Sequence, residues 1–397
     1  MTLALVNGRV LTGGRIARGL AVIVEAGRIK ALAPASDPLP PGARRIDLDG
    51  GLLLPGFNDI QVNGGAGILF NDAPTVESIR RIGSAHRRFG TTGFLPTLIS
   101  DDLATVRAAI DATRQAIAEG VPGVLGVHIE GPFLNVKRKG IHDASKFRLI
   151  DDEAFALLTS LGIGRTVVTI APEKTSMGMI RRLAESGVVV SAGHTNGSYK
   201  TLRAALDNGL TGFTHLFNAM SPLTSREPGV VGAALEDPAS WCSLIVDGRH
   251  VDPVVLKIAL RCKPLDRFIL ATDAMPCVGS GEKSFRLQGK LITVKDGACV
   301  DEDGTLAGSD LDMASAVRNA VNLLGLDLLD ASRMASGNPA QFLGLGDLLG
   351  RIAPGYRADL VLLDDGLGVL DTWIGGRSLS DPEASGAPPR HASGQGR

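Results

Sequence analysis

The stretch Val124-Leu125-Gly126-Val127-His128-Ile129-Glu130 is a short apolar run that ends in side chains able to do chemistry. Similar apolar runs recur along the chain at 57–62, 93–98, 166–170, 188–192, 212–216, 243–246 and 268–272. Most intervals between them hold a segment with a helical pattern, such as 75–89, 103–118, 201–208 and 252–261. Eight strand–helix units over roughly 220 residues are typical of a (β/α)8 barrel. An open doubly wound sheet is the alternative, but no G-x-G-x-x-G follows the first run, so we predict an α/β fold of the TIM-like barrel type.

The two ends of the chain have a different pattern. Short strands are expected at 3–9 and 21–23, and again at 360–363 and 372–374, with glycine-containing turns between them. Because chain termini often lie close together, these strands can pair into one small β-sandwich domain. We therefore predict that residues 1–53 and 346–380 form this domain and that 54–345 form the barrel. The stretch 381–397 is rich in Pro, Ser, Gly and Ala and is expected to be disordered.

Composition narrows the class of protein. The chain has 397 residues, with 41 Lys and Arg against 42 Asp and Glu, so no basic surface for nucleic acid is expected. No run approaches the length of about 18 apolar residues that a membrane span needs, and Asn7 and Arg9 interrupt the apolar N-terminal stretch that a secretory signal would need. The four cysteines are far apart with no C-x-x-C, which argues against a disulfide framework. We expect a cytoplasmic protein.

Three of the runs end in residues that bind metals. Glu130 follows the third run, His194 the fifth and His215 the sixth. Each alone is most simply a hydrogen-bonded structural residue, but the strands of a barrel bring their carboxyl ends to one mouth. Two imidazoles and one carboxylate are a suitable catalytic zinc set with an open position. His128 lies two residues before Glu130, so we expect it one layer deeper, supporting the site without binding the metal.

Asp273 and the first run complete the predicted site. Asp273 follows the eighth run; in isolation it could merely cap the next segment, but beside a metal-bound water it could accept and return a proton. The first run ends in Gln61-Val62-Asn63, whose amides are weak metal ligands. We therefore expect one divalent metal per subunit, Zn²⁺ in preference to Fe²⁺, Co²⁺ or Mn²⁺, with Gln61 hydrogen-bonding the water or a ligand.

Five motifs resemble those of the amidohydrolase superfamily and, more narrowly, those of the N-acetylglucosamine-6-phosphate deacetylases within it. They are Leu54-Pro55-Gly56-Phe57-Asn58-Asp59, His128-Ile129-Glu130-Gly131-Pro132-Phe133, Ser191-Ala192-Gly193-His194-Thr195, Thr214-His215-Leu216-Phe217-Asn218-Ala219-Met220 and Ala271-Thr272-Asp273-Ala274. The resemblance runs from residue 53 to 310, and the H-x-E-G-P and T-H-L-F-N-A-M blocks are its most specific parts. Many amidohydrolases carry His-x-His at the position of Gln61-Val62-Asn63, so the departure there bears on the number of metals.

The resemblance implies a substrate and further site residues. It implies hydrolysis of N-acetyl-D-glucosamine 6-phosphate to D-glucosamine 6-phosphate and acetate, with Glu130, His194 and His215 as metal ligands and Asp273 as the catalytic acid and base. It assigns His142 to the acetamido group, and it implies contacts with the sugar phosphate from Asn218, Ala219, Arg226, His250, Leu306, Ala307 and Gly308. It also implies a homodimer in which Arg226 reaches into the neighbouring site.

Other functions remain open at this point. The chain could act on a different N-acylated sugar phosphate, such as the galacto epimer, or on a cyclic amide as a dihydroorotase-like enzyme does. It could also be a barrel that has lost its chemistry and serves as a scaffold. That last alternative predicts that the metal-binding and catalytic residues have been replaced, whereas Glu130, His194, His215 and Asp273 are all present.

Overall fold

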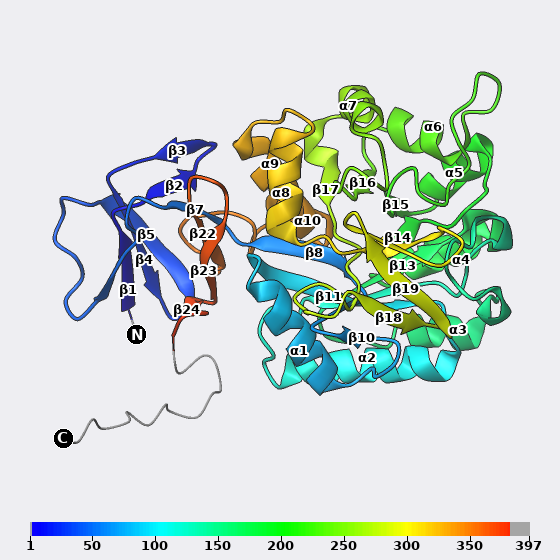
Figure 1. Cartoon of the computed structure of the whole chain (residues 1–397), viewed down its shortest axis with the longest axis horizontal. Helices are drawn as coiled ribbons and strands as arrows, with labels where there is room; N and C mark the ends of the chain where they lie inside the picture. The colour runs from blue at the N-terminus through cyan, green and yellow to red at the C-terminus, as the bar shows by residue number, and fades with distance from the viewer. Residues whose placement is uncertain (1, 382–397) are drawn as a thin grey trace.

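The computed structural model describes residues 2–381 (Figure 1), so the predicted tail 381–397 lies outside the described residues except for Asp381. Strands from both ends of the chain form one lobe, and a larger barrel surrounded by helices forms the other (Figure 1). Among the described residues, no helix has the length and apolar character that crossing a membrane requires.

The barrel is one sheet of eight parallel strands that pair in chain order. They are β8 (Phe57–Val62), β11 (Thr91–Ile99), β12 (Gly126–Glu130), β13 (Arg165–Ile170), β14 (Val189–Ala192), β15 (Leu210–Phe213), β16 (Trp241–Leu244) and β17 (Phe268–Leu270). A parallel bridge between Val62 and Ala274 joins the first strand to the segment after the last, which nearly closes the barrel. The predicted TIM-like (β/α)8 barrel is confirmed.

Helices surround the barrel (Figure 1). They are α1 (Val76–Arg87), α2 (Leu103–Ala118), α3 (Asp152–Leu158), α4 (Met177–Glu185), α5 (Tyr199–Leu206), α6 (Gly229–Glu236), α7 (Pro253–Cys262), α8 (Met313–Asn322), α9 (Leu328–Ala335) and α10 (Gly337–Phe342). The side chains of Thr75, Ser198 and Asp252 accept hydrogen bonds from the first turns of α1, α5 and α7, which explains where these helices begin. The four helical segments expected from the sequence correspond to α1, α2, α5 and α7.

The small lobe is a β-sandwich built from both termini. One sheet has the order β5-β4-β1-β6 and the other β24-β23-β22-β7-β2-β3. Their bounds are β1 (Thr2–Val6), β2 (Arg9–Thr12), β3 (Arg15–Ala17), β4 (Leu20–Glu25), β5 (Arg28–Pro34), β6 (Arg44–Asp47), β7 (Leu52–Pro55), β22 (Leu360–Leu363), β23 (Val369–Ile374) and β24 (Arg377–Ser378). Leu5 and Val22 of one sheet share a buried apolar cluster with Leu360 and Trp373 of the other. The expected domain limit at residue 53 falls within β7, which pairs with both β2 and β22.

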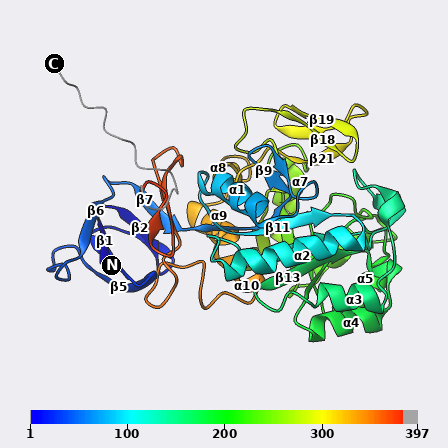
Figure 2. The ribbon, with the colours of Figure 1, turned by 90° about the horizontal axis from the view of Figure 1, so that it is seen from below.

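A second small sheet, not foreseen from the sequence, follows the last barrel strand. Its antiparallel strands are β18 (Ser284–Leu287), β19 (Lys290–Lys295), β20 (Ala298–Val300) and β21 (Leu306–Ser309), and the two-residue strands β9 (Gly64–Gly65) and β10 (Ile68–Leu69) form a separate hairpin. Figure 2 shows the larger of these sheets standing out on one side of the barrel. The backbone N–H of Ser309 donates to the carbonyl of Asp273 at 2.9 Å, which ties this sheet to the barrel mouth.

Candidate active site

Polar side chains gather at the mouth of the barrel because they follow the ends of its strands. Glu130 ends β12, His194 and His215 lie just beyond β14 and β15, and Asp273 lies just beyond β17. The backbones of His194, His215 and Asp273 have φ angles of 47°, 37° and 53°. Residues other than glycine rarely adopt this conformation, and it is frequent at functional sites. The chain therefore turns sharply at each of these three strand ends.

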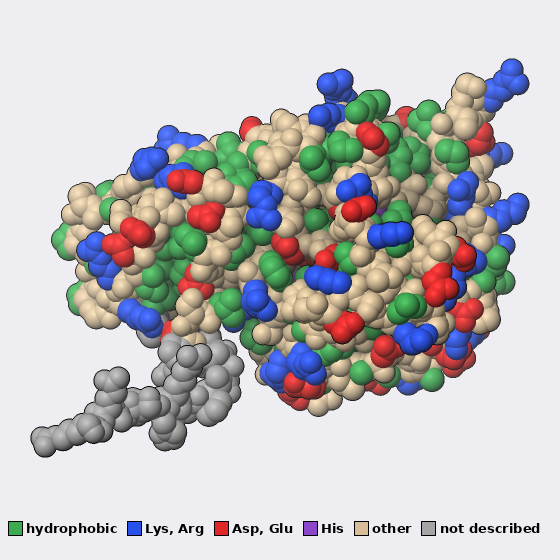
Figure 3. All heavy atoms as spheres, viewed as in Figure 1, with side chains coloured by type: hydrophobic (Ala, Val, Ile, Leu, Met, Phe, Trp, Pro, Cys, Tyr) green, Lys and Arg blue, Asp and Glu red, His purple; other side chains and the backbone are tan. Residues whose placement is uncertain are grey.

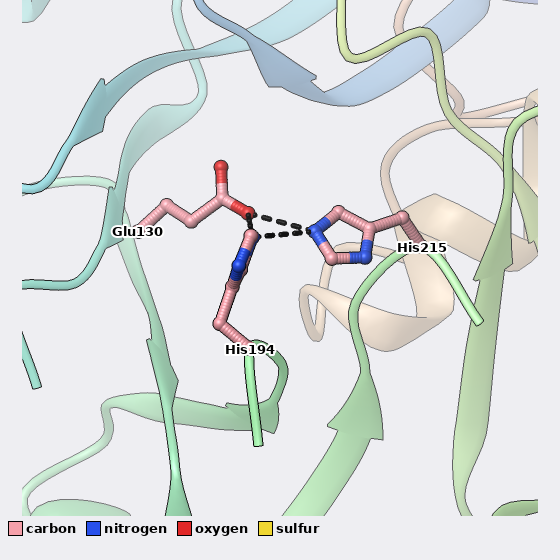
Figure 4. A group of neighbouring side chains, drawn as sticks. All are labelled: Glu130, His194 and His215. Atoms are coloured by element: carbon pink, nitrogen blue, oxygen red, sulfur yellow. Dashed lines mark hydrogen bonds and ion pairs between the residues drawn. The ribbon is translucent and has the colours of Figure 1, made fainter. Parts of the chain in front are cut away.

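The side chains of Glu130, His194 and His215 point toward one another (Figure 4). Oε1 of Glu130 lies 2.9 Å from Nε2 of His215 and 3.2 Å from Nε2 of His194, and the two Nε2 atoms are 3.1 Å apart. All three residues are buried. Their ligand atoms lie within 4.8 Å of one another, and this donor set is typical of a catalytic zinc site with an open position.

The protonation states of His194 and Glu130 also suit the binding of a cation. Nδ1 of His194 lies 2.9 Å from the carbonyl oxygen of Arg138, so it carries the proton, and Nε2 presents a lone pair to the cluster. Burial alone would raise the pKa of Glu130, but the neighbouring imidazoles of His194 and His215 outweigh it and hold that pKa well below its usual range. An ionised carboxylate and an imidazole lone pair that face each other are stabilised by a cation between them, so these residues fit a divalent metal.

Asp273 lies beside the cluster and is held by the amides of the first barrel strand. Nδ2 of Asn63 donates to Oδ1 of Asp273 at 2.6 Å, and Nε2 of Gln61 donates to the same oxygen at 3.1 Å. Gln61 Nε2 also donates to Oε2 of Glu130 at 3.0 Å. Both bonds to Asp273 use Oδ1, which leaves Oδ2 without a hydrogen bond among the described residues. Burial and the neighbouring charge of Glu130 raise the pKa of Asp273, which suits a group that accepts a proton and returns it.

Two further histidines face the same pocket. Nδ1 of His142 accepts hydrogen bonds from the backbone N–H of Ser100 at 3.4 Å and from its hydroxyl at 2.8 Å, so Nε2 of His142 carries the proton. Burial and the nearby His194 lower the pKa of His142 well below its usual range, which keeps the ring neutral. Nδ1 of His250 lies 2.6 Å from Oδ2 of Asp247, which fixes the orientation of that ring.

These residues surround a pocket of about 450 Å³. The expected site residues that line it are Glu130, His142, His194, His215, Asn218, Ala219, His250, Asp273, Leu306, Ala307 and Gly308. Gln61 and His128 lie beneath the pocket, in a narrow cavity inside the barrel, where His128 Nε2 is 2.7 Å from Oγ1 of Thr169. Arg226 does not line the pocket; it is exposed in the loop 221–228 that precedes α6.

Sequence reasoning missed several residues of the pocket wall. Lys137, Arg138, Met275 and Leu287 also line it, whereas Asn63, which lines it too, was expected at the mouth from the end of the first run. Lys137 and Arg138 lie in the loop after β12, and such loops lie at the mouth of a barrel, so their position was a usable signal. Leu287 comes from the second small sheet, which was not predicted. Asp247 carries no signal of its own, because it acts only through its contact with His250.

Fold and site together define a barrel enzyme of the hydrolase class, with a donor set that fits a metal ion and a partly buried carboxyl group beside it. The chain belongs to the amidohydrolase family. The model described as "Amidohydrolase family" matches residues 52–379, and the one described as "NagA composite domain" matches residues 3–53.

Individual proteins similar to this chain are consistent with this family assignment. The chain is 43% identical over 380 residues to an N-acetylgalactosamine-6-phosphate deacetylase of a Shewanella species, covering 95% of this chain and 96% of the relative. It is 35% identical over 380 residues to the N-acetylglucosamine-6-phosphate deacetylase of Haemophilus influenzae, covering 95% and 99%. The crystal structure of N-acetylglucosamine-6-phosphate deacetylase from Pasteurella multocida superposes with a TM-score of 0.92 at 34% identity, covering 95% of this chain and 99% of that one.

Proposed function

We propose that this amidohydrolase removes the acetyl group from N-acetyl-D-glucosamine 6-phosphate and releases D-glucosamine 6-phosphate and acetate. The observation that carries the proposal is the meeting of Glu130, His194 and His215 with Asp273 at one end of a single pocket. The relatives from Haemophilus influenzae and Pasteurella multocida support it, because each matches over 99% of its length and bears the name of that activity.

Glu130, His194 and His215 would hold one divalent metal, and we propose Zn²⁺. The bound ion would polarise the amide carbonyl and acidify a water molecule. We propose a single ion because the amide nitrogens of Gln61 and Asn63 face carboxylates and cannot act as ligands. The family's His-x-His position is thus occupied by hydrogen-bond donors that hold Asp273 and Glu130 in place.

Asp273 and His142 would carry out the chemical step. Oδ2 of Asp273 accepts the proton of the attacking water and then delivers it to the amide nitrogen, because an unprotonated amine is a very poor leaving group. His142 is neutral and its Nε2 carries a proton, so it can donate a hydrogen bond to the carbonyl oxygen as negative charge develops there.

The rest of the pocket would bind the phosphosugar. His250, positioned by Asp247, lies in the wall with Asn218 and Ala219, and the 304–308 loop forms a further part of the wall. A phosphate group takes charge-assisted hydrogen bonds from imidazolium and from backbone N–H groups. We propose that the sugar lies between the metal cluster and these groups, with its 6-phosphate toward His250.

Acetate release tests the proposed function directly. With the purified protein loaded with Zn²⁺, acetate release is followed for N-acetyl-D-glucosamine 6-phosphate and for the same sugar without phosphate. Ring opening is followed for dihydroorotate, as a cyclic amide. We expect kcat/KM to be highest for the phosphorylated sugar. Turnover of dihydroorotate alone would contradict the proposal, and equal turnover of both sugars would contradict the phosphate contacts.

The galacto epimer is a second candidate substrate. The relative from a Shewanella species, at 43% identity, bears the name of an N-acetylgalactosamine-6-phosphate deacetylase. The two substrates differ only in the orientation of one ring hydroxyl, and the metal cluster would act on the same acetamido group in both. Measuring kcat/KM for both phosphosugars decides between them, and a higher value for the galacto form would replace the first proposal with the second.

We also propose that the enzyme is a homodimer in which Arg226 reaches the partner's pocket. On α7, Val254 and Ile258 are 62% and 55% exposed, and Leu223, in the loop of Arg226, is 57% exposed. Figure 3 shows hydrophobic side chains along the edge where Figure 1 places α7. Val254 and Ile258 are four residues apart on α7 and so lie on one face of it, and exposed apolar groups that share a face are typical of interaction surfaces.

Mixing two impaired variants tests the dimer. If Arg226 serves the partner's pocket, Arg226→Ala and Asp273→Asn subunits should regain some activity when they are mixed and allowed to exchange. No recovery, together with a monomeric mass by light scattering, would contradict the homodimer.

The cytoplasm remains the proposed compartment, and cell fractionation tests it.

A further inference from the structure

One carboxylate outside the pocket wall, that of Glu173, bonds to the two residues that follow the proposed metal ligand His194 and to a third residue that bonds to the carbonyl of His194. Glu173 lies in the short helix Pro172–Lys174 that follows β13, the fourth barrel strand, whose end contributes no residue to the metal cluster. Oε1 of Glu173 accepts hydrogen bonds from Nδ2 of Asn135 and from the backbone N–H of Asn196, both at 2.7 Å. Oε2 accepts the hydroxyl of Thr195. One side chain therefore joins the loops after three barrel strands.

These three donors flank His194. Thr195 and Asn196 follow it directly in the chain, and the backbone N–H of Asn135 donates to the carbonyl of His194 at 3.0 Å. His194 has a φ angle of 47°, which is unfavourable for a residue with a side chain. A conformation of this kind persists only where its surroundings enforce it, and Glu173 bonds to the chain immediately after His194 and to the residue that holds its carbonyl.

The same carboxylate also acts on the imidazole ring. Asn196, held by Glu173 through its backbone, accepts a hydrogen bond from Nε of Arg138 through Oδ1 at 2.9 Å. The carbonyl oxygen of Arg138 in turn lies 2.9 Å from Nδ1 of His194, and this contact fixes the ring with Nε2 toward Glu130 and His215. The hydrogen bonds thus form a continuous path from Glu173 through Asn196 and Arg138 to His194.

We propose that Glu173 is a positioning residue for the metal site, which fixes both the backbone and the ring of His194 so that Nε2 is presented to the ion. The inference rests on the proposed metal site and extends it to a residue with no contact to the metal or substrate. Residues that orient a ligand in this way commonly change metal affinity by ~10–100-fold when they are lost. Glu173 should therefore set how tightly the ion is held.

Metal affinity without substrate tests this inference. Apo protein is titrated with Zn²⁺ against a chromophoric chelator, and with Co²⁺ while its visible absorption spectrum is followed. Glu173→Ala should raise the Kd for both ions by ~10–100-fold and change the Co²⁺ spectrum. Glu173→Gln should have a smaller effect, because its Oε1 can still accept from Asn135 and Asn196.

Asp237→Asn is the matched control. Asp237 also accepts several hydrogen bonds in a loop, from the backbone N–H groups of Ala239 at 3.0 Å and Ser240 at 2.7 Å, and from Arg203 at 2.7 Å. It precedes β16, at the end of the barrel opposite the mouth, so its loss should lower the melting temperature without changing the metal Kd.

Wild-type Kd values and a wild-type Co²⁺ spectrum in Glu173→Ala would overturn the proposal, as would an equal rise in Kd for Asp237→Asn. If Glu173→Ala does not fold, the Kd of Glu173→Gln decides, because that variant keeps the size of the side chain. The readout needs no substrate, so a protein that deacetylates none of the sugars tested would overturn the proposed function and leave this result standing.

Discussion

Replacing Asp273 with asparagine removes the proposed proton carrier and keeps its surroundings. In the wild-type protein Oδ1 of Asp273 already accepts from Asn63 at 2.6 Å and from Gln61 at 3.1 Å. The oxygen of an asparagine can accept the same two bonds, so only the free Oδ2 is replaced, by an NH2 group that cannot accept a proton. Burial and Glu130 raise the pKa of Asp273, so its loss also removes an unfavourable buried charge.

The size of the effect follows from that one missing atom. A positioned general acid and base typically contributes ~10²–10⁴-fold to the rate. At about 1.36 kcal/mol per factor of ten, this is ~2.7–5.4 kcal/mol of transition-state stabilisation. We expect kcat for acetate release to fall by that factor. Metal content should stay at the wild-type level, because Asp273 is not among the three cluster residues.

Two measurements on the same preparation check this expectation. Acetate release under saturating phosphosugar gives kcat, and elemental analysis after gel filtration gives the metal content. A kcat within about threefold of wild type would refute the reasoning, since such a change is far below the range for general acid–base catalysis. Loss of the metal would instead show that Asp273 holds the ion. Asp237→Asn, remote from the mouth, should leave both values unchanged.

Four further outcomes are expected. His194→Ala and His215→Ala should each lower metal content in elemental analysis, and wild-type content in both would contradict their assignment as ligands. Arg226→Ala should lower kcat/KM for the phosphorylated sugar at least ~10-fold, the loss of one or more charge-assisted hydrogen bonds, and equal losses on the unphosphorylated sugar would show that Arg226 acts elsewhere. Gln61→His should raise the metal retained after mild chelation from one ion toward two, whereas two ions already required by the wild type would overturn the single-metal proposal. Burial raises the pKa of Asp59 from 3.8 to about 7, so the folded protein favours the neutral form of this carboxyl group. The free energy of unfolding should therefore fall by ~4 kcal/mol as the pH rises from about 4 through 7. In urea titrations Asp59→Asn should flatten this pH dependence, and an unchanged dependence would show that Asp59 is ionised in the folded protein throughout this range.

The barrel could be predicted because each of its strands is a local pattern. Runs such as 57–62 and 268–272 are apolar over about the length of one strand, and the barrel rule then places their ends together. That rule is also why Glu130, His194 and His215 could be brought into one site although they are far apart in sequence. The strand ends had to be located only to within a few residues for this prediction to succeed, since His215 lies beyond β15 and still reaches the cluster.

The unpredicted parts depend on contacts that a local pattern does not encode. The strands β18 to β21 are short, and β18 and β19 carry exposed polar side chains, so the alternation is weak. Gln288-Gly289 and Asp296-Gly297 are nevertheless turn signals that could have indicated hairpins. Glu173 had no signal, because its role comes from three donors on other loops. The two bonds from Gln61 to Glu130 and Asp273 likewise depend on three strands meeting at measured distances.

The sandwich of the small lobe has a consequence for how the chain is made. The sheet β5-β4-β1-β6 uses only N-terminal residues and can form soon after they leave the ribosome, whereas β7 pairs with β22, where Leu53 faces Leu362. The apolar face that carries Leu5 and Val22 must therefore wait, uncovered by Leu360 and Trp373, while the entire barrel is synthesised. Transiently exposed apolar surface of this kind promotes aggregation and chaperone binding. A nascent chain that stops before β22 would keep that face exposed, so strands translated after the barrel complete a lobe whose first sheet is translated before it.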